Sequence, residues 1–243
     1  MIARKRKGHD IYHGRDPREI PTYGIWEASH LLKIPIPTLR SWIRGRYYPT
    51  QRYGRRHFEP LIVLPDPDLP LLSFINLVEA HVLDAIRYKD LIKLPRVRSA
   101  IAHLRDRYNS VHPLVEHEFQ HDGVDLFVEI EKELINVSSG GQLAMREILF
   151  AYLQRIARDP HRSAIALYPY LKRHQVEDKK LVLIDPRISF GKPVLVGIGV
   201  PTSVVADRHQ AGETIAELAK DYECEASEIE KAIDYERALP KAA

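Results

Sequence analysis

Two prolines, Pro35 and Pro37, divide the first amphipathic stretch of the chain into two short segments. Proline has no backbone N–H and a fixed φ, so it suits the start of a helix and disrupts the interior of one. The pattern predicts a first helix over residues 25–33, a tight turn at the prolines, and a second helix over residues 37–45. Ala28 is small enough to let the two helices cross closely, so we expect a helix-turn-helix.

The second predicted helix separates apolar from polar side chains. Leu39, Trp42 and Ile43 share the face that is expected to point inward. In a helix-turn-helix protein the second helix enters the major groove, where an arginine can bond two acceptors of guanine at once. The polar face is therefore the candidate surface for reading DNA bases, and its residues are Thr38, Arg40, Ser41 and Arg44.

A basic, tyrosine-rich segment follows the second helix and is centred on Gly54. It predicts a β-hairpin wing that contacts the phosphate backbone while the helix occupies the groove. Residues 1–60 hold 13 Lys/Arg against 5 Asp/Glu, a net charge of +8 that favours a polyanionic partner. The alternative is a charged helical hairpin that binds protein, and the run Arg4–Lys7 is either a phosphate-binding arm or a solvated tail. The candidate wing residues are Arg46, Tyr47, Arg52, Tyr53, Arg55, Arg56 and His57.

The middle of the chain begins after a stiff connector that contains Pro65, Pro67 and Pro70. Apolar spacing and two-residue alternation predict the elements that follow. In order, they are a helix over 71–90, a helix that opens at Pro95, a small antiparallel sheet around 124–130 behind the turn at Asp122-Gly123, a helix over 142–158, and a strand over 164–168. Residues 172–180 are predicted to be a polar linker.

The tail is predicted to form two short strands, at 181–184 and 193–196, followed by three short helices. Residues 213–237 hold 9 acids against 3 bases, a net charge of −6. The last two helices have helix-turn-helix spacing, but their carboxylates would repel phosphates. This unit is therefore expected to contact protein rather than DNA. Ser227 and Glu230 have the spacing of a capping box at the start of the last helix.

The head resembles the MerR-like helix-turn-helix at the N-terminus of a group of VapB-type antitoxins, through residues 23–46. The likeness continues, in the same order, through Leu72–His81, His112–Leu114, Asp122-Gly123 and Gly140–Leu143. The tail residues 184–202 resemble a domain family of formerly unknown function that forms the C-terminal part of those antitoxins. This chain has Gly197-Ile198-Gly199 where the family typically has Gly-Thr-Arg.

The resemblance implies a type II antitoxin that binds and suppresses a PIN-like ribonuclease toxin. It also implies that the protein binds its own promoter DNA, as a homodimer or within a larger complex with the toxin, and represses the operon. No catalytic residue and no cofactor are implied. The acidic tail would then serve in dimerisation, in toxin contact, or in both.

The predicted fold class is α+β and mainly helical. Residues 1–64 are expected to form a winged helix-turn-helix, and residues 71–175 a central α+β region with a small antiparallel sheet. Residues 181–243 are expected to form a strand-turn-strand followed by a three-helix, helix-turn-helix-like unit. The N-terminus is charged and lacks an apolar stretch behind it, so a cytoplasmic protein without a membrane span is expected.

One rival function is zinc-dependent proteolysis by His117-Glu118-Phe-Gln-His121, which matches H-E-x-x-H. In the strand expected there, the two histidines would lie about 13 Å apart, too far to share one zinc. Another is a stand-alone helix-turn-helix transcription regulator with a ligand pocket in the middle region. Two further expectations are an unreactive Cys224 beside two carboxylates, and core positions for both Trp26 and Trp42.

Overall fold

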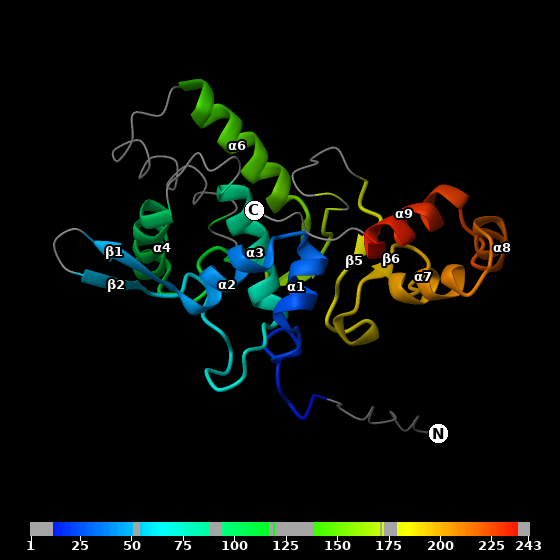
Figure 1. Ribbon diagram of the computed structural model, residues 1–243, viewed down its shortest axis with the longest axis horizontal. Coiled ribbons are helices and arrows are strands. Elements are labelled where there is room, and N and C mark those ends of the chain that lie inside the picture. Colours follow the sequence, from blue (N-terminus) through cyan, green and yellow to red (C-terminus); the bar gives the residue numbers. More distant parts are fainter. Residues whose placement is uncertain are drawn as a thin grey trace, which may run out of the picture.

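The computed structural model describes residues 12–50, 54–87, 94–116, 119, 139–170, 172 and 179–237. The expected class, α+β and mainly helical, is confirmed, because the described strands pair only in short two-stranded antiparallel sheets. Figure 1 shows the β1–β2 hairpin and the helices α7–α9 at opposite ends, with α1, α2 and α3 between them. The elements of the first half are α1 (Ile25–Leu32), α2 (Ile36–Arg44), β1 (Arg46–Thr50), β2 (Gly54–Phe58), α3 (Phe74–Ile86) and α4 (Leu94–Tyr108). Those of the second half are α6 (Ser139–Leu153), β3 (Ile156–Arg158), β4 (Ala164–Leu167), β5 (Val182–Leu183), the 3-10 turn η3 (Ser189–Gly191), β6 (Val194–Leu195), α7 (Thr202–Gln210), α8 (Ile215–Asp221) and α9 (Ala226–Arg237).

The two helices predicted around the prolines are confirmed as α1 and α2. Lys33 ends α1 in a left-handed conformation, with φ at 58°, and its N–H donates to the carbonyl of His30. Pro35 occupies the N-cap position of α2. Ala28 is fully buried in α1, and the apolar face of α2 is buried as expected.

Helix α3 forms the centre of the molecule, with α1 and α6 packed against it. Every α3 residue except Ile75 is buried, and Ser73 begins the helix with a capping box to Asn76. Its buried polar side chains have partners on other segments. The Nδ1 atom of His112 lies 2.9 Å from Oε2 of Glu79, and Nε2 of His81 lies 3.1 Å from the carbonyl oxygen of Tyr152.

The helix expected over 142–158 is wrong at its C-terminal end, because α6 stops at Leu153. Residues 156–158 instead pair with the predicted strand, which is confirmed as β4. The guanidinium of Arg155 explains the break. It is buried and donates to the carbonyls of Tyr168 and Pro169, contacts that turn the chain back along β4.

Several expectations lie outside the described residues. They are the basic run at 4–7, the turn at 122–123 with its sheet, the motif residues His117, Glu118 and His121, and most of the linker at 172–180.

The tail contains the predicted pair of strands, β5 and β6, and the three predicted helices. Helix α9 packs on both α7 and α8, and the three helices enclose a small apolar core of their own. Its buried members are Leu195, Val205, Leu218, Ala219, Ile229, Ala232 and Ile233. Among the described residues, no helix combines the length and the apolar character that a membrane crossing needs.

The capping box expected at Ser227 is wrong. Helix α9 begins at Ala226, so Ser227 lies inside the helix, and the N–H of Glu225 donates to a carboxylate oxygen of Glu228. The tail does contain a complete capping box, in which Thr214 and Glu217 open α8.

Candidate nucleic-acid interface

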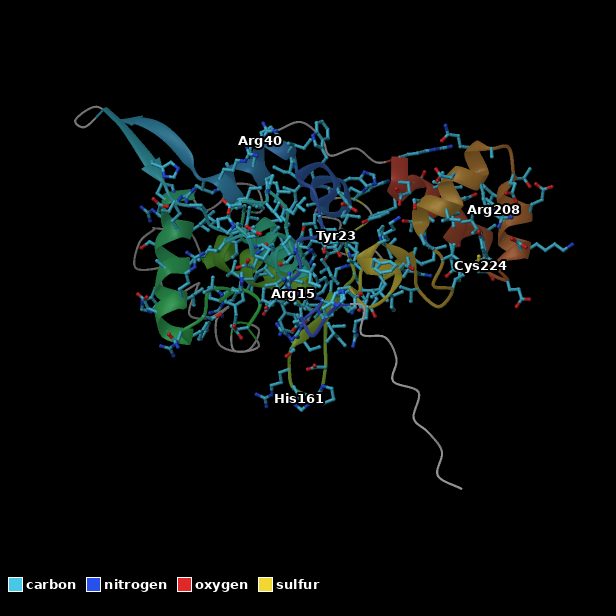
Figure 2. The ribbon with its side chains drawn as sticks, turned by 90° about the horizontal axis from the view of Figure 1, so that it is seen from below. Arg15, Tyr23, Arg40, His161, Arg208 and Cys224 are labelled. Carbon is cyan, nitrogen blue, oxygen red and sulfur yellow. The ribbon has the colours of Figure 1, made fainter. Side chains whose placement is uncertain are left out.

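The two arginines of the predicted base-reading face are exposed on α2. Arg40 and Arg44 are four residues apart, so they share one face of the helix. Within the described part of the chain, neither forms an ion pair. Figure 2 places Arg40 at the outer edge of the molecule, on the side where the β1–β2 hairpin projects. Both guanidinium groups are therefore available to an external acceptor.

The two hydroxyl residues of this face lie deeper. Thr38 and Ser41 are half-buried, and the hydroxyl of Ser41 donates to the carbonyl of Thr38 at 2.7 Å. With its proton engaged inside the helix, the Ser41 oxygen is left as an acceptor. That chemistry suits the amino groups of adenine or cytosine rather than a phosphate.

The predicted wing is present as an antiparallel hairpin directly after α2. In its register Arg46 lies opposite Phe58, Tyr47 opposite His57 and Pro49 opposite Arg55, and Arg56 lies opposite Tyr48. Arg52 and Tyr53 belong to the connecting turn, which lies outside the described residues. His57 is exposed, and its Nδ1 atom lies 3.5 Å from a carboxylate oxygen of Glu59.

Segments that follow the wing fix it to the helix-turn-helix. The carbonyl of Trp42, near the end of α2, accepts from the N–H groups of Leu61 and Ile62 at 2.7 and 3.1 Å. Helix α4 lies beside the hairpin in both views (Figures 1 and 2). The side chain of Arg98 donates to the carbonyl of Glu59, and that of Arg105 donates to the carbonyl of Leu61 at 2.8 Å.

The sequence analysis did not predict that α4 contacts the segment that follows the wing. The available signal was the density of arginines along residues 94–108, of which Arg98 and Arg105 are seven residues apart and therefore share a face. The structure thus brings together α1, α2, the wing and α4 as a single surface-forming unit.

One aromatic expectation is wrong. Trp26 is 72% exposed, whereas Trp42 is 1% exposed and lies in the core as expected. The buried face of α1 carries Ala28, Leu31 and Leu32. Position 26 lies on the opposite side of this short helix, so a large side chain there has no core to enter.

The tail presents a different electrostatic surface. Arg208 forms ion pairs with Glu213 and Asp221, and its guanidinium lowers the pKa of the Glu213 carboxyl. Exposed acids remain on α9, including Glu230 and Asp234. The charge argument against DNA contact at this unit therefore agrees with the placement of its side chains.

Cys224 lies half-buried in the tail (Figure 2). Burial raises the pKa of its thiol, and the carboxylates of Glu228 and Glu225 raise it further. A thiol with a raised pKa is a poor nucleophile at neutral pH. Within the described residues no three His, Cys, Asp or Glu side chains are grouped to hold a metal ion.

Two segments of the chain match known families. Residues 21–101, which span α1 to the first half of α4, match a family described as "Putative DNA-binding HTH domain". Residues 182–235, which span β5 to α9, match a family described as "Protein of unknown function (DUF433)". The fold and the family match together define a protein with an N-terminal helix-turn-helix domain of a putative DNA-binding class.

Comparison with individual proteins narrows that class. The chain is similar to the "Putative antitoxin VapB45" of Mycobacterium tuberculosis (strain ATCC 25618 / H37Rv), at 29% identity over 89% of this chain and 94% of the relative. It is also similar to the "Uncharacterized protein Rv2308" of the same strain, at 25% identity over 90% of each chain. The crystal structure of Rv2018 from M. tuberculosis superposes with a TM-score of 0.63 at 26% identity, covering 88% of this chain and 98% of that one. These likenesses support a DNA-binding antitoxin and suggest a regulator rather than an enzyme.

Proposed function

We propose that this chain is a DNA-binding antitoxin that suppresses a PIN-like ribonuclease toxin and represses its own operon as a dimer. The observation that carries the DNA-binding part is the pair of exposed arginines on α2, beside a hairpin wing. The observation that supports the antitoxin part is the likeness to a named antitoxin over 89% of the chain.

Within this proposal the four polar residues of α2 read bases. Arg40 and Arg44 supply bidentate donors for guanine, and Thr38 and Ser41 supply shorter-range hydroxyl contacts. The wing residues Arg46, Tyr47, Arg52, Tyr53, Arg55, Arg56 and His57 hold the phosphate backbone. A dimer is part of the proposal because one short helix reads too few bases for useful affinity.

The acidic tail serves protein contact in this proposal. A ribonuclease must hold a polyanionic substrate, so its substrate surface carries positive charge, and a surface like that of α9 complements it. The exposed acids of α8 and α9 supply this complement, and they include Glu217, Glu230 and Asp234. The toxin is thus expected to bind the tail while the head remains available to DNA.

Two experiments test the proposal. In the first, the wild-type protein selects duplexes from a random-sequence library. Its affinity for the enriched sequence, the selected duplex, is then compared with its affinity for a scrambled duplex of the same composition. Preferential binding to the selected duplex is expected, and equal binding to both duplexes would remove the base-reading role of α2.

In the second, the protein is co-expressed with the adjacent open reading frame and recovered by affinity tag. A stoichiometric small nuclease in the eluate is the expected result. A protein that emerges alone but selects DNA is a stand-alone regulator. A protein that emerges alone with stoichiometric zinc directs attention to His117, Glu118 and His121.

A further inference from the structure

The tail contacts both ends of α1, the first helix of the helix-turn-helix. At the start of the helix, the hydroxyl of Tyr23 donates to the carbonyl of Gly191 at 3.0 Å. At its end, the hydroxyl of Tyr235 donates to the carbonyl of Leu31 at 2.8 Å. The two contacts join residues that are 168 and 204 positions apart in the sequence.

Glu236 is the centre of the second contact. One carboxylate oxygen lies 3.3 Å from Nε2 of His30, on α1. The other accepts from the hydroxyl of Thr202, the first residue of α7. One side chain thus joins α1 of the head to α7 and α9 of the tail, and replacing it would weaken both contacts.

Tyr235 has a different role from the rest of α9. It is fully buried and belongs to the main core of the molecule, whereas Ile229 and Ile233 belong to the core of the tail. Lys33, at the end of α1, donates from its ammonium group to the carbonyl of Tyr235, and its Nζ lies 4.1 Å from the centre of the Tyr235 ring. The side chain of Tyr235 therefore packs into the main core against the head.

The first contact requires a glycine. A Cβ on Gly191 would lie 2.1 Å from the hydroxyl oxygen of Tyr23. The turn that carries it is unusual, because Ser189, Phe190 and Gly191 all have positive φ, at 49°, 56° and 78°. Non-glycine residues adopt this region only where surrounding contacts hold them there.

Helix α1 depends on such support. It has eight residues, and helices this short are not stable without tertiary contacts. Its inner face packs on α2, which carries Arg40 and Arg44. Any rotation of α1 therefore moves the base-reading face.

We propose that the turn at 189–191 together with Tyr235 and Glu236 forms a clamp on α1, and that Tyr235 and Glu236 are positioning residues for DNA binding. This inference rests on the proposed DNA-binding function. It makes the tail part of the DNA-reading machinery although its own surface is acidic and does not need to touch DNA. By linkage, DNA and any partner that loosens the clamp oppose each other.

Amide hydrogen exchange of the free, full-length protein tests the clamp without DNA. Tyr235→Phe removes only the hydroxyl that bonds Leu31, and Glu236→Gln removes the charge that faces His30. We expect the amides of residues 25–32 to exchange about three- to tenfold faster in each variant, the factor that one lost hydrogen bond gives. Glu230→Gln, which removes an exposed carboxylate from the same helix, is the matched control and should leave the exchange unchanged.

DNA binding then tests the positioning role. For both clamp variants we expect the affinity for the selected duplex to fall by about three- to tenfold, since base contacts depend on the orientation of α2. Affinity for the scrambled duplex, which depends on phosphate contacts, should change by less than about twofold. His30→Ala combined with Glu236→Gln should lose less affinity than the sum of the two single losses, because the two residues share one contact.

Gly191→Ala is an independent variant at the other end of the clamp. It should weaken binding to the selected duplex, and adding Tyr23→Phe should restore part of the loss by removing the oxygen that the new Cβ meets. Circular dichroism melts confirm that each variant is folded at the assay temperature.

The possible outcomes distinguish the clamp, the positioning role and the proposed DNA-binding function. Wild-type exchange in Tyr235→Phe and Glu236→Gln overturns the clamp. Faster exchange with unchanged affinity for the selected duplex overturns the positioning role and leaves the DNA-binding proposal intact. Failure of the wild-type protein to select any duplex overturns the DNA-binding proposal and the positioning role together, and the exchange result then still reports whether the clamp exists.

Discussion

The side chains of α2 and of the wing divide the work of DNA recognition in the proposed function. Arg40 is exposed on α2, the helix that is proposed to enter the groove, whereas Arg55 belongs to a hairpin strand, opposite Pro49. A contact to a base edge contributes to specificity, and a contact to a phosphate contributes to affinity for every sequence. Substitutions at these two positions should therefore have different signatures.

Arg40→Ala is expected to weaken binding to the selected duplex by about 1–3 kcal/mol and to relax the preference at one base pair. The measurement is a fluorescence-anisotropy titration against the selected duplex and its single-base variants. Lys220→Ala, which removes an exposed cation from the tail, is the control and should bind as the wild type does.

Arg55→Ala is expected to weaken binding to all duplexes equally and to reduce the slope of log affinity against log salt by about one unit. The same titration, repeated from low to moderate salt, measures that slope. Identical behaviour of Arg40→Ala and Arg55→Ala would show that the assigned division of work is wrong.

The two tryptophans of the chain offer a matched pair for stability. Trp42→Ala should lower the free energy of unfolding by about 3–5 kcal/mol, since the indole is buried in the main core. Trp26→Ala should change it by less than about 0.5 kcal/mol, because that indole is mostly in solvent. Urea denaturation followed by circular dichroism gives both values, and comparable losses at the two sites would contradict the placement of α1.

His112 gives the central region a pH dependence. Burial lowers the pKa of His112, but the hydrogen bond and the negative charge of Glu79 raise it more, so the net shift is upward. A raised pKa in the folded state means that the stabilisation is complete below the unfolded value of about 6.5 and is lost as pH rises through the folded value. The unfolding free energy lost in His112→Gln should therefore be larger at pH 6 than at pH 8.5, and an equal loss at both pH values would argue against a charged pair.

At the scale of elements, local signals identify most of the fold. Prolines 35 and 37 mark the break between α1 and α2, and Gly54 marks the wing, because each residue restricts or frees the backbone where it stands. The end of α6 is different. Residues 156–158 suit a helix or a strand, and only the partner strand β4 and the buried Arg155 decide between them.

The N-terminal caps of α8 and α9 test how well local sequence signals identify the start of a helix. Thr214→Ala should lower the stability of the tail by about 0.5–2 kcal/mol, because it removes the hydroxyl that accepts from the N–H of Glu217. Ser227→Ala, the position that the sequence favours, should have almost no effect because Ser227 is inside α9. Hydrogen exchange of residues 215–237 distinguishes the two, and a larger effect at Ser227 would restore the cap expected from the sequence.

At the scale of the whole molecule, the described residues form a main core, which joins the head, the central region and Val182, Ile184 and Tyr235 of the tail, and a smaller core within the tail. The candidate base-reading residues could be predicted from the sequence because they follow from the periodicity of one helix. The contacts of Tyr235 with Leu31 and of Arg98 with Glu59 could not, because nothing local indicates which distant segments meet. The expected domain boundaries at residues 64, 71, 175 and 181 also depend on contacts between distant segments.

The arrangement of cores predicts how the molecule unfolds. Leu77→Ala, at the centre of α3, should lower the stability of the head and the central region together by about 2–5 kcal/mol. Ile229→Ala, in the tail core, should increase hydrogen exchange mainly in residues 202–237. Exchange that rises uniformly along the chain in both variants would instead indicate one cooperative unit.

The placement of the two tryptophans also provides an optical assay that requires no label. The chain has two tryptophans, one on each helix of the helix-turn-helix, and they differ in exposure from 72% to 1%. Acrylamide should quench the red-shifted emission of Trp26 and leave the blue-shifted emission of Trp42 nearly untouched. Rearrangement of α1 and insertion of α2 into a duplex would therefore produce separate changes in the fluorescence emission of a single sample.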